Sequence, residues 1–288
     1  MAQLQRLTIA PEQIQDQQII LSYSQQHYLI EVLRLGDRGR FIAMDGQGHW
    51  WLAALSDAKG KKAKILEPIP AATELPSGIS LIIAMPKGNN AFDELVRQTT
   101  EIGVARIYPV TSQRSLLKPS QHKLERWRRI ATEAAEQSER QQVPTVAEPI
   151  SFEASLSLPG SDRYICIARG HTLAGGDTPH LLDCLQNSAS GNSARGNSAS
   201  SQDRSPTIEP PASSPGSVFP SSGSSSILIA TGPEGGWTRA EVELAIAAGF
   251  VAVSLGRRIL TARTAPIFAA SLAAAVFEAR AIAPYIFP

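Results

Sequence analysis

The residues best suited to chemistry form a glycine-rich turn, Gly232-Pro233-Glu234-Gly235-Gly236, which follows the apolar run from Ile227 to Ala230. A second apolar run, Val251 to Leu255, also ends at a glycine, Gly256. Glycine carries no Cβ atom, so the backbone can approach a ligand closely at such turns. Ligands of open α/β sheets bind beyond the carboxyl ends of the strands, and the two turns therefore predict a small-molecule site. The alternative is a pair of ordinary tight turns.

Two common phosphate-binding patterns are absent from this sequence. It contains no GxxxxGK[ST] segment and no GxGxxG segment that opens a helix after a strand. The first pattern cradles nucleoside triphosphates, and the second binds dinucleotides. The sequence therefore does not favour a nucleoside triphosphate or a dinucleotide as the ligand.

A capped helix is predicted between the two turns. Thr238 precedes an apolar helical pattern, and Glu241, three residues later, completes a capping box. Val242 and Ala245 have the spacing of a buried helix stripe. Gly249 is well placed to end the helix in a left-handed conformation. The segment therefore predicts a strand, a turn, a helix and a second strand.

Strands and helices also alternate earlier in the chain. The patterns predict strands at Ile79 to Met85 and Val104 to Val110, and helices at Phe92 to Ile102 and Leu124 to Ser138. This alternation is typical of a parallel sheet covered by helices. Residues 76–288 are therefore predicted to form an α/β domain.

Residues 1–75 differ in pattern and are predicted to form a separate domain. Short strands at Arg40 to Asp45, Trp50 to Leu55 and Lys62 to Glu67 are separated by glycine-containing turns, as in a small β-barrel. One helix is expected around Gln25 to Leu33, and the proline-rich stretch from Pro68 to Gly78 reads as a linker.

Residues 187–226 have the composition of a disordered insertion. The segment is rich in serine, repeats Asn-Ser-Ala, and has almost no large apolar residues, so it cannot offset the entropy of ordering. We expect it to be dispensable for stability and activity. A partner-binding arm is the alternative.

Composition excludes several classes of protein. The net charge of +1 gives no global sign of a nucleic-acid binder, so any such contact must come from local clusters. Cys166 and Cys184 suggest neither a disulfide framework nor a metal site, and Cys166 is expected to be buried. No signal peptide and no run of about 18 apolar residues occurs. The sequence predicts a cytoplasmic protein without a membrane anchor or a metal.

The segment GPEGGWTRAEVELAIAAGF with the later SLGRRIL resembles the SPOUT superfamily of S-adenosylmethionine-dependent RNA methyltransferases. The resemblance is strongest to its RsmE-type family, which methylates ring nitrogen 3 of a uridine in small-subunit (16S) ribosomal RNA. It extends to residues 27–37, 85–115 and 123–140 in the family's order.

This resemblance implies a PUA-like β-barrel at the N-terminus that grips RNA, followed by a SPOUT α/β domain with a trefoil knot. It also implies a homodimer, with contacts on the helix expected at Ala265 to Ala283 and Phe277 facing outward. A monomer that buries this helix against its own sheet is the alternative. The implied activity is methylation of ribosomal RNA. A non-catalytic RNA-binding paralogue that keeps the fold is the competing interpretation.

The resemblance and the two turns together assign candidate site residues. Those expected to bind S-adenosylmethionine are Ala230, Thr231, Gly232, Pro233, Glu234, Gly235, Gly236, Leu255, Gly256, Ile259, Leu260 and Thr264. Those expected to contact RNA are Arg6, His27, Arg34, Lys87, Arg114, Gln137 and Arg140. For the basic helix residues, a solvated face is the alternative. No general base is identified, although Glu101 and Glu133 are candidates by placement.

Three positions depart from the family pattern. Glu139 replaces a glycine in the family's EQSGR segment. Where the family reads ILRTETA, Thr261 replaces the arginine and Arg263 replaces the glutamate. The reversed charge could alter cofactor affinity or weaken catalysis, unless Arg257 or Arg258 supplies the missing cation.

Overall fold

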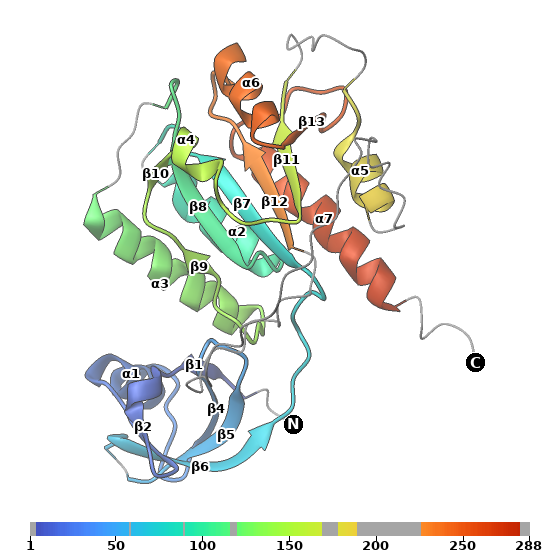
Figure 1. The fold of residues 1–288 in the computed structure, drawn as a ribbon. Helices are drawn as coiled ribbons and strands as arrows, with labels where there is room; N and C mark the ends of the chain where they lie inside the picture. Colours follow the sequence, from blue (N-terminus) through green and yellow to red (C-terminus); the bar gives the residue numbers. More distant parts are fainter. Residues whose placement is uncertain are drawn as a thin grey trace, which may run out of the picture.

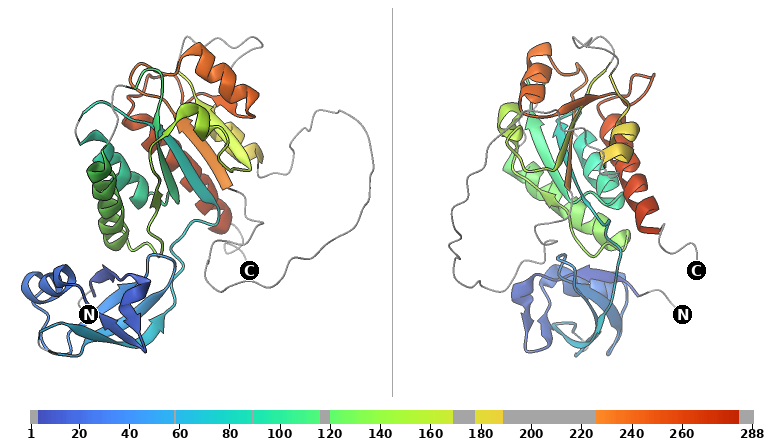
Figure 2. Two further views of the ribbon diagram at one scale, coloured as in Figure 1. Left: turned by 60° about the vertical axis from the view of Figure 1, so that its left-hand side comes forward. Right: turned by 45° about the vertical axis from the view of Figure 1, so that its right-hand side comes forward.

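The computed structural model describes residues 4–57, 59–88, 90–115, 120–168, 178–188 and 226–282. They form two separate sheets, one of six strands and one of seven. In Figure 1 the six-stranded sheet lies at the bottom and the seven-stranded sheet above it, with the connection after β6 rising between them. Figure 2 shows the same two bodies from two further directions.

The first sheet curls and holds its own core. Its strands, in the order β1-β4-β5-β6-β3-β2, are β1 (Arg6–Thr8), β4 (Arg40–Met44), β5 (Trp50–Leu55), β6 (Lys62–Ile69), β3 (Gln18–Ile20) and β2 (Ile14–Gln15). β1 pairs with β4 in parallel, and the other pairs are antiparallel. The three longest strands confirm the predicted ones to within two residues at either end.

The helix predicted around Gln25 to Leu33 is confirmed in place, although its second half is π-helical. A 3-10 turn, η1 (Pro11–Gln13), precedes α1 (Tyr23–His27), which passes into a π-helical turn, η2 (Tyr28–Val32). Ser22 and Gln25 form a capping box at the start of α1, so the helix begins earlier than the apolar pattern suggests.

The second sheet is parallel throughout, with strand order β10-β8-β7-β12-β11-β13 and β9 on β8. Its strands are β7 (Gly78–Ala84), β8 (Arg106–Thr111), β9 (Thr145–Val146), β10 (Ile150–Ser151), β11 (Asp162–Cys166), β12 (Ser226–Thr231) and β13 (Val251–Val253). Its helices are α2 (Ala91–Glu101), α3 (Gln121–Gln137), α4 (Phe152–Ser155), α5 (Leu181–Ser188), α6 (Arg239–Ala247) and α7 (Thr264–Ile282). The predicted alternation and parallel sheet are confirmed.

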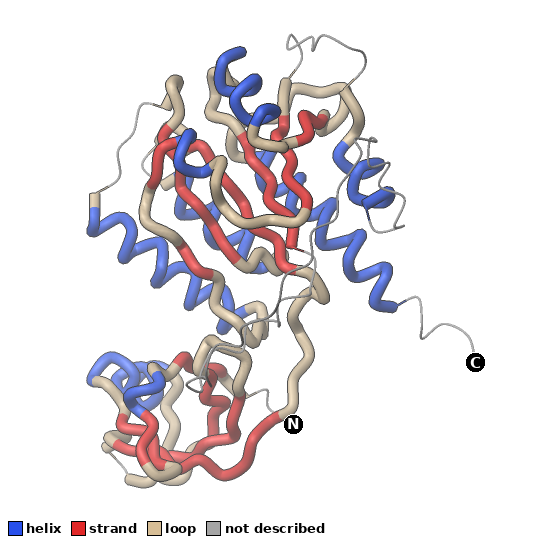
Figure 3. The backbone as a smooth tube through the Cα atoms, viewed as in Figure 1, coloured by secondary structure: helices blue, strands red, loops and turns tan. Residues whose placement is uncertain are grey.

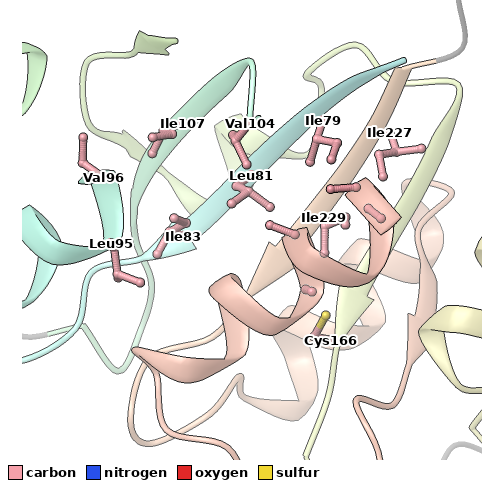
Figure 4. Packing of buried hydrophobic residues seen from close by; sticks show 14 of the residues in the cluster. Ile79, Leu81, Ile83, Leu95, Val96, Val104, Ile107, Cys166, Ile227 and Ile229 are labelled. Carbon is pink, nitrogen blue, oxygen red and sulfur yellow. The ribbon is translucent and has the colours of Figure 1, made fainter. Parts of the chain in front are cut away.

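Both faces of this sheet are buried because alternate side chains of each strand point to opposite sides. Ile79, Leu81 and Ile83 of β7 join one core with residues of α2, α3, α5 and α7. Figure 4 shows these isoleucine and leucine side chains packed with Val96, Val104 and Ile107, together with Cys166 of β11. Ile82 and Ala84 join the opposite core under α4 and α6. The apolar run from Ile79 to Met85 therefore reflects a strand buried on both faces.

Helix α7 packs into its own chain. Ala269, Ala273 and Phe277 are buried in the core beneath it, with Phe277 only 6% exposed. The expectation that Phe277 faces outward is wrong, because this side of the helix covers the sheet. Ser271 and Ala275 lie on the exposed side. Among the described residues, no helix is long and apolar enough to cross a membrane.

The predicted insertion lies mostly outside the described residues. Asn187 and Ser188 complete α5, and Ser226 begins β12, whereas residues 189–225 are not among those described. The backbone N–H of Ser161 donates to Ser226 O at 2.8 Å, which joins the start of β12 to the residue before β11. Both flanks of the insertion are therefore part of the folded body.

Candidate functional site

The loops after β7, β8, β12 and β13 meet at one edge of the parallel sheet, called the carboxyl edge below. Figure 3 shows these loops in tan at the top of the sheet. Thr231 pairs with Ile83, and Cys166 pairs with Val253, so the strands end at similar heights. The structure thus brings both sequence-predicted turns to one edge, with β11 between their strands.

The glycine-rich turn is held open by backbone conformation at Gly236. Gly236 has a φ of +67°, which side chains other than glycine rarely adopt, and its N–H donates to Pro233 O at 2.8 Å. A Cβ atom on Gly236 would meet nothing within 4 Å. At Gly235 a Cβ would lie 3.1 Å from Cδ of Arg114. The two glycines therefore have different roles. Gly236 permits the backbone conformation of the turn, and Gly235 leaves space for the Arg114 side chain.

Glu241 ties this turn to the loop after β8. Its carboxylate accepts from Thr238 N–H at 2.7 Å, which is the predicted capping box, and from Gln113 N–H at 2.8 Å. The side chain is fully buried. Buried carboxylates need such donors, so Glu241 fixes the distance between the two loops.

Glu234 makes a similar link to the loop after β7. Its Oε1 accepts from the backbone N–H of Lys87 at 2.7 Å. Arg114 Nη1 donates to the carbonyl oxygen of Gly235. The Lys87 backbone thus fixes the Glu234 side chain, and Arg114 fixes the carbonyl group of Gly235. The other backbone groups of the turn stay at the carboxyl edge.

The second turn also shows the signs of a binding loop. Gly256 has a φ of +106°, and its N–H donates to Ser254 Oγ at 3.1 Å. Ile259 is 75% exposed beside the exposed side chains of Arg257 and Arg258. Thr261 Oγ1 accepts from Thr264 N–H at 3.2 Å and so caps the first turn of α7.

The predicted RNA contacts fall into separate groups. Lys87 and Arg114 are exposed at the carboxyl edge. His27 and Arg34 are exposed on the first sheet's helical segment, with Arg34 at a φ of +55°. Arg6 and Gln137 line a cleft of about 630 Å³ between β1, α1 and the end of α3.

We call the region where β1 meets the end of α3, together with Arg140 just after that helix, the seam. Its residues are Arg6, Thr8, Glu136, Glu139 and Arg140. Arg6 Nη2 lies 2.8 Å from Glu139 Oε2, and its guanidinium carbon lies 5.0 Å from the centre of a Trp50 ring. Glu139 has a φ of +61°, which explains why the family pattern has glycine at this position. Burial raises the pKa of Glu136, although Thr8 N–H donates to it at 2.6 Å and acts in the opposite direction.

The expectation that Arg140 contacts RNA is contradicted by its burial. Arg140 is 4% exposed, and its guanidinium forms an ion pair with Glu74. The same group donates to the carbonyl oxygens of Thr100 at 3.0 Å and Val104 at 2.8 Å. Its donors are engaged within the protein, so Arg140 is a structural residue.

The two candidate bases lie far from the carboxyl edge. Glu101 is the last residue of α2, and Glu133 is in the last part of α3. Helix α2 begins after the loop that follows β7 and rises about 1.5 Å per residue, which puts Glu101 roughly 15 Å from the carboxyl edge along the axis. Glu133 instead lines the cleft beside β1. Neither placement suits a base beside the glycine-rich turn.

Burial raises the pKa of the Cys166 thiol to about 12, as expected for a small buried side chain in β11. The described residues contain no group of three His, Cys, Asp or Glu side chains that could hold a metal ion.

Comparison with known proteins identifies relatives that match most of the chain. A family model described as RNA methyltransferase domain matches residues 73–192 and 198–274. Ribosomal RNA small subunit methyltransferase E from Synechocystis is 41% identical over 95% of this chain and 78% of its own length. The Bacillus subtilis protein of the same name is 27% identical over 85% of each chain.

A solved structure agrees with these relatives. The ribosomal RNA small subunit methyltransferase E of Neisseria gonorrhoeae, bound to S-adenosyl methionine, superimposes with a TM-score of 0.69 at 26% identity. The match covers 97% of this chain and 98% of that one.

Proposed function

Because this chain belongs to the RNA methyltransferase family that includes ribosomal RNA small subunit methyltransferase E, we propose that it methylates ring nitrogen 3 of a uridine in small-subunit ribosomal RNA. S-adenosylmethionine is the methyl donor. The observation that carries the proposal is the glycine-rich turn at the carboxyl edge, which Glu234 and Glu241 tie to the loops after β7 and β8 through backbone N–H groups, with the second turn at Gly256 at the same edge. The non-catalytic alternative is not favoured, since the relatives that match most of the chain are named as methyltransferases.

The turn residues fit the cofactor by their shape and backbone groups. Gly236 and Gly256 take left-handed conformations, and a Cβ on Gly232 would come within 3.3 Å of the Trp237 ring. The indole nitrogen of Trp237 is buried without a hydrogen-bond partner in the described part of the chain. Residues 230–236 and 255–260, with Thr264, would hold the adenosyl portion mainly through backbone groups.

The bound cofactor supplies an electrophilic methyl carbon on a positively charged sulfur. The chain's own residues then position the acceptor and exclude water, and such orientation can contribute roughly 7–11 kcal/mol to lowering a barrier. Lys87 and Arg114, exposed beside the glycine-rich turn, would hold the RNA backbone so that one uridine reaches the edge. Arg6, His27, Arg34 and Gln137 are proposed to extend this contact over the first sheet.

The finer features of the fold are proposals that the same membership supports. We propose that residues 1–75 are a PUA-like RNA-binding domain and that residues 76–288 are a SPOUT domain with a trefoil knot, working in the cytoplasm. A homodimer is proposed through the exposed side of α7, where Ser271 and Ala275 would allow close helix approach. Phe277 is buried within the single chain, so it is not among the residues proposed for this contact.

The decisive experiment is methyl transfer from labelled S-adenosylmethionine to unmodified small subunits and to naked small-subunit RNA. Mass spectrometry of the product is expected to find one methyl group on ring nitrogen 3 of a uridine. Binding of the cofactor without any transfer to either substrate would instead favour the non-catalytic paralogue. Light scattering measures the dimer independently, with Ala275→Glu as the disrupting variant.

A further inference from the structure

Arg263 lies against the backbone of the loop after β7. Its Nη2 atom donates to Lys87 O at 3.4 Å. The same atom lies 3.0 Å from the position that a Cβ of Gly88 would occupy, and Gly88 has a φ of +108°. The glycine therefore makes space for the guanidinium, and the carbonyl group orients it.

This contact occupies only a small part of the hydrogen-bonding capacity of Arg263. A guanidinium has five N–H donors, and the bond to Lys87 O uses one of them. No acidic side chain among the described residues forms an ion pair with Arg263, which is exposed. The group is therefore partly fixed, charged and open to a ligand.

The charges around Arg263 favour an anionic ligand. Lys87 and Arg114 are exposed on the neighbouring loops and are connected to Arg263 through the backbone contacts of the glycine-rich turn. Glu234 is the carboxylate within this network, and Lys87 N–H already occupies one of its oxygens. Three exposed cationic side chains thus come from loops that are linked by backbone contacts to a turn with one carboxylate, in a chain whose net charge is only +1.

We propose that Arg263 binds a phosphate of the substrate RNA, as the third cation of a rim formed with Lys87 and Arg114 beside the glycine-rich turn. This inference rests on the proposed function. An arginine oriented by a backbone carbonyl loses less conformational freedom on binding, and its fork matches phosphate oxygens in a bidentate manner. Thr261 meanwhile caps α7, so the two departures at positions 261 and 263 have separate roles.

The test compares variants of the full-length protein for binding to transcribed small-subunit ribosomal RNA at several salt concentrations. Arg263→Gln is expected to weaken binding about 3- to 10-fold at physiological salt and to reduce the logarithmic salt slope by about 0.7–0.9. Arg263→Lys is expected to recover most of the slope, and Arg263→Glu to bind more weakly than Arg263→Gln. Arg239→Gln is the matched control, because Arg239 is exposed on α6 and pairs with Glu243.

Calorimetry with S-adenosylmethionine shows whether Arg263 contributes to binding of the cofactor or to binding of RNA. Unchanged cofactor affinity in Arg263→Gln supports the proposal. Lower cofactor affinity with wild-type RNA binding would assign Arg263 to the cofactor and overturn it, as would an RNA affinity and salt slope equal to those of Arg239→Gln. Because the readout is RNA binding, a protein that binds RNA but transfers no methyl group would refute the proposed function and leave this test intact.

Discussion

The carboxyl edge and the seam both carry arginines, but the two regions use them in opposite ways. At the carboxyl edge, Arg114 and Arg263 donate to backbone carbonyls and remain exposed. At the seam, Arg140 is buried, forms an ion pair with Glu74 and donates to two backbone carbonyl oxygens. An arginine aligned to a family motif can therefore serve recognition or architecture, and burial with the available donors distinguishes the two.

The largest effect that would test this comparison is expected for Arg140→Ala at the seam. The substitution leaves Glu74 without its cation and leaves two carbonyl groups without their donor. Unfolding free energy is expected to fall by about 3 kcal/mol, since breaking a buried pair strands a charge. Denaturant titration measures it, with Arg128→Ala as the exposed control. A loss of RNA binding at unchanged unfolding free energy would instead show that Arg140 contacts RNA.

The next effect is expected for Glu241→Gln at the carboxyl edge. The glutamine nitrogen would face an N–H donor of either Thr238 or Gln113, so one of the two links must break. A loss of about 2 kcal/mol in unfolding free energy is expected, together with weaker binding of S-adenosylmethionine. Glu243→Gln on the exposed side of α6 is the control and should leave both unchanged. If cofactor affinity survives in Glu241→Gln, the link between these loops does not shape the site.

A smaller effect separates the two glycines of the turn. Gly236→Ala forces a side chain into a left-handed conformation and is expected to cost about 1 kcal/mol, or roughly fivefold in cofactor affinity if the turn relaxes. Gly235→Ala instead meets only the flexible Cδ of Arg114 and is expected to change cofactor affinity less than RNA affinity. Calorimetry and RNA titration of both variants measure the difference. Equal effects of the two substitutions on both ligands would argue against their separate roles.

The smallest effect concerns the pH dependence of the seam. Burial raises the pKa of Glu136 in the folded state, so the folded protein takes up this proton before the unfolded chain does as pH falls. Wild type is therefore expected to gain stability relative to Glu136→Gln as pH falls from 7 through that raised pKa. The glutamine keeps an acceptor for Thr8 N–H, so the difference at pH 7 should stay within about 1 kcal/mol. Parallel curves for the two proteins between pH 7 and pH 5 would contradict the assignment.

Much of the parallel sheet could be predicted because its elements carry strong local signals. The apolar run at Ile79, the capping box at Thr238 and Glu241, and the glycines after β12 and β13 all reflect local conformation or burial. The two-residue strands β2, β9 and β10 carry too few residues for a periodic pattern, and they form only because neighbouring strands offer hydrogen bonds.

The fate of individual charged side chains could not be predicted in the same way. Arg140 meets Glu74, which lies 66 residues earlier, and Glu234 meets Lys87 across 147 residues. Phe277 likewise lies in a helix that is apolar on nearly all sides, where the sequence does not indicate which side covers the sheet. Such contacts depend on tertiary placement, so a motif can locate the site while leaving the partners of its side chains open.

The long segment between α5 and β12 offers a position for attaching a label to the protein. Ser226 starts β12 at the end of the strand opposite to the glycine-rich turn, and Ser188 is bonded to Tyr164 of β11 at 2.8 Å. A fluorophore or affinity tag inserted just before Ser226 would join the protein at the amino end of β12, away from the proposed methyl-transfer edge. The chain thus contains a natural labelling position from which ligand binding can be followed while the loops around Gly236 keep their native sequence.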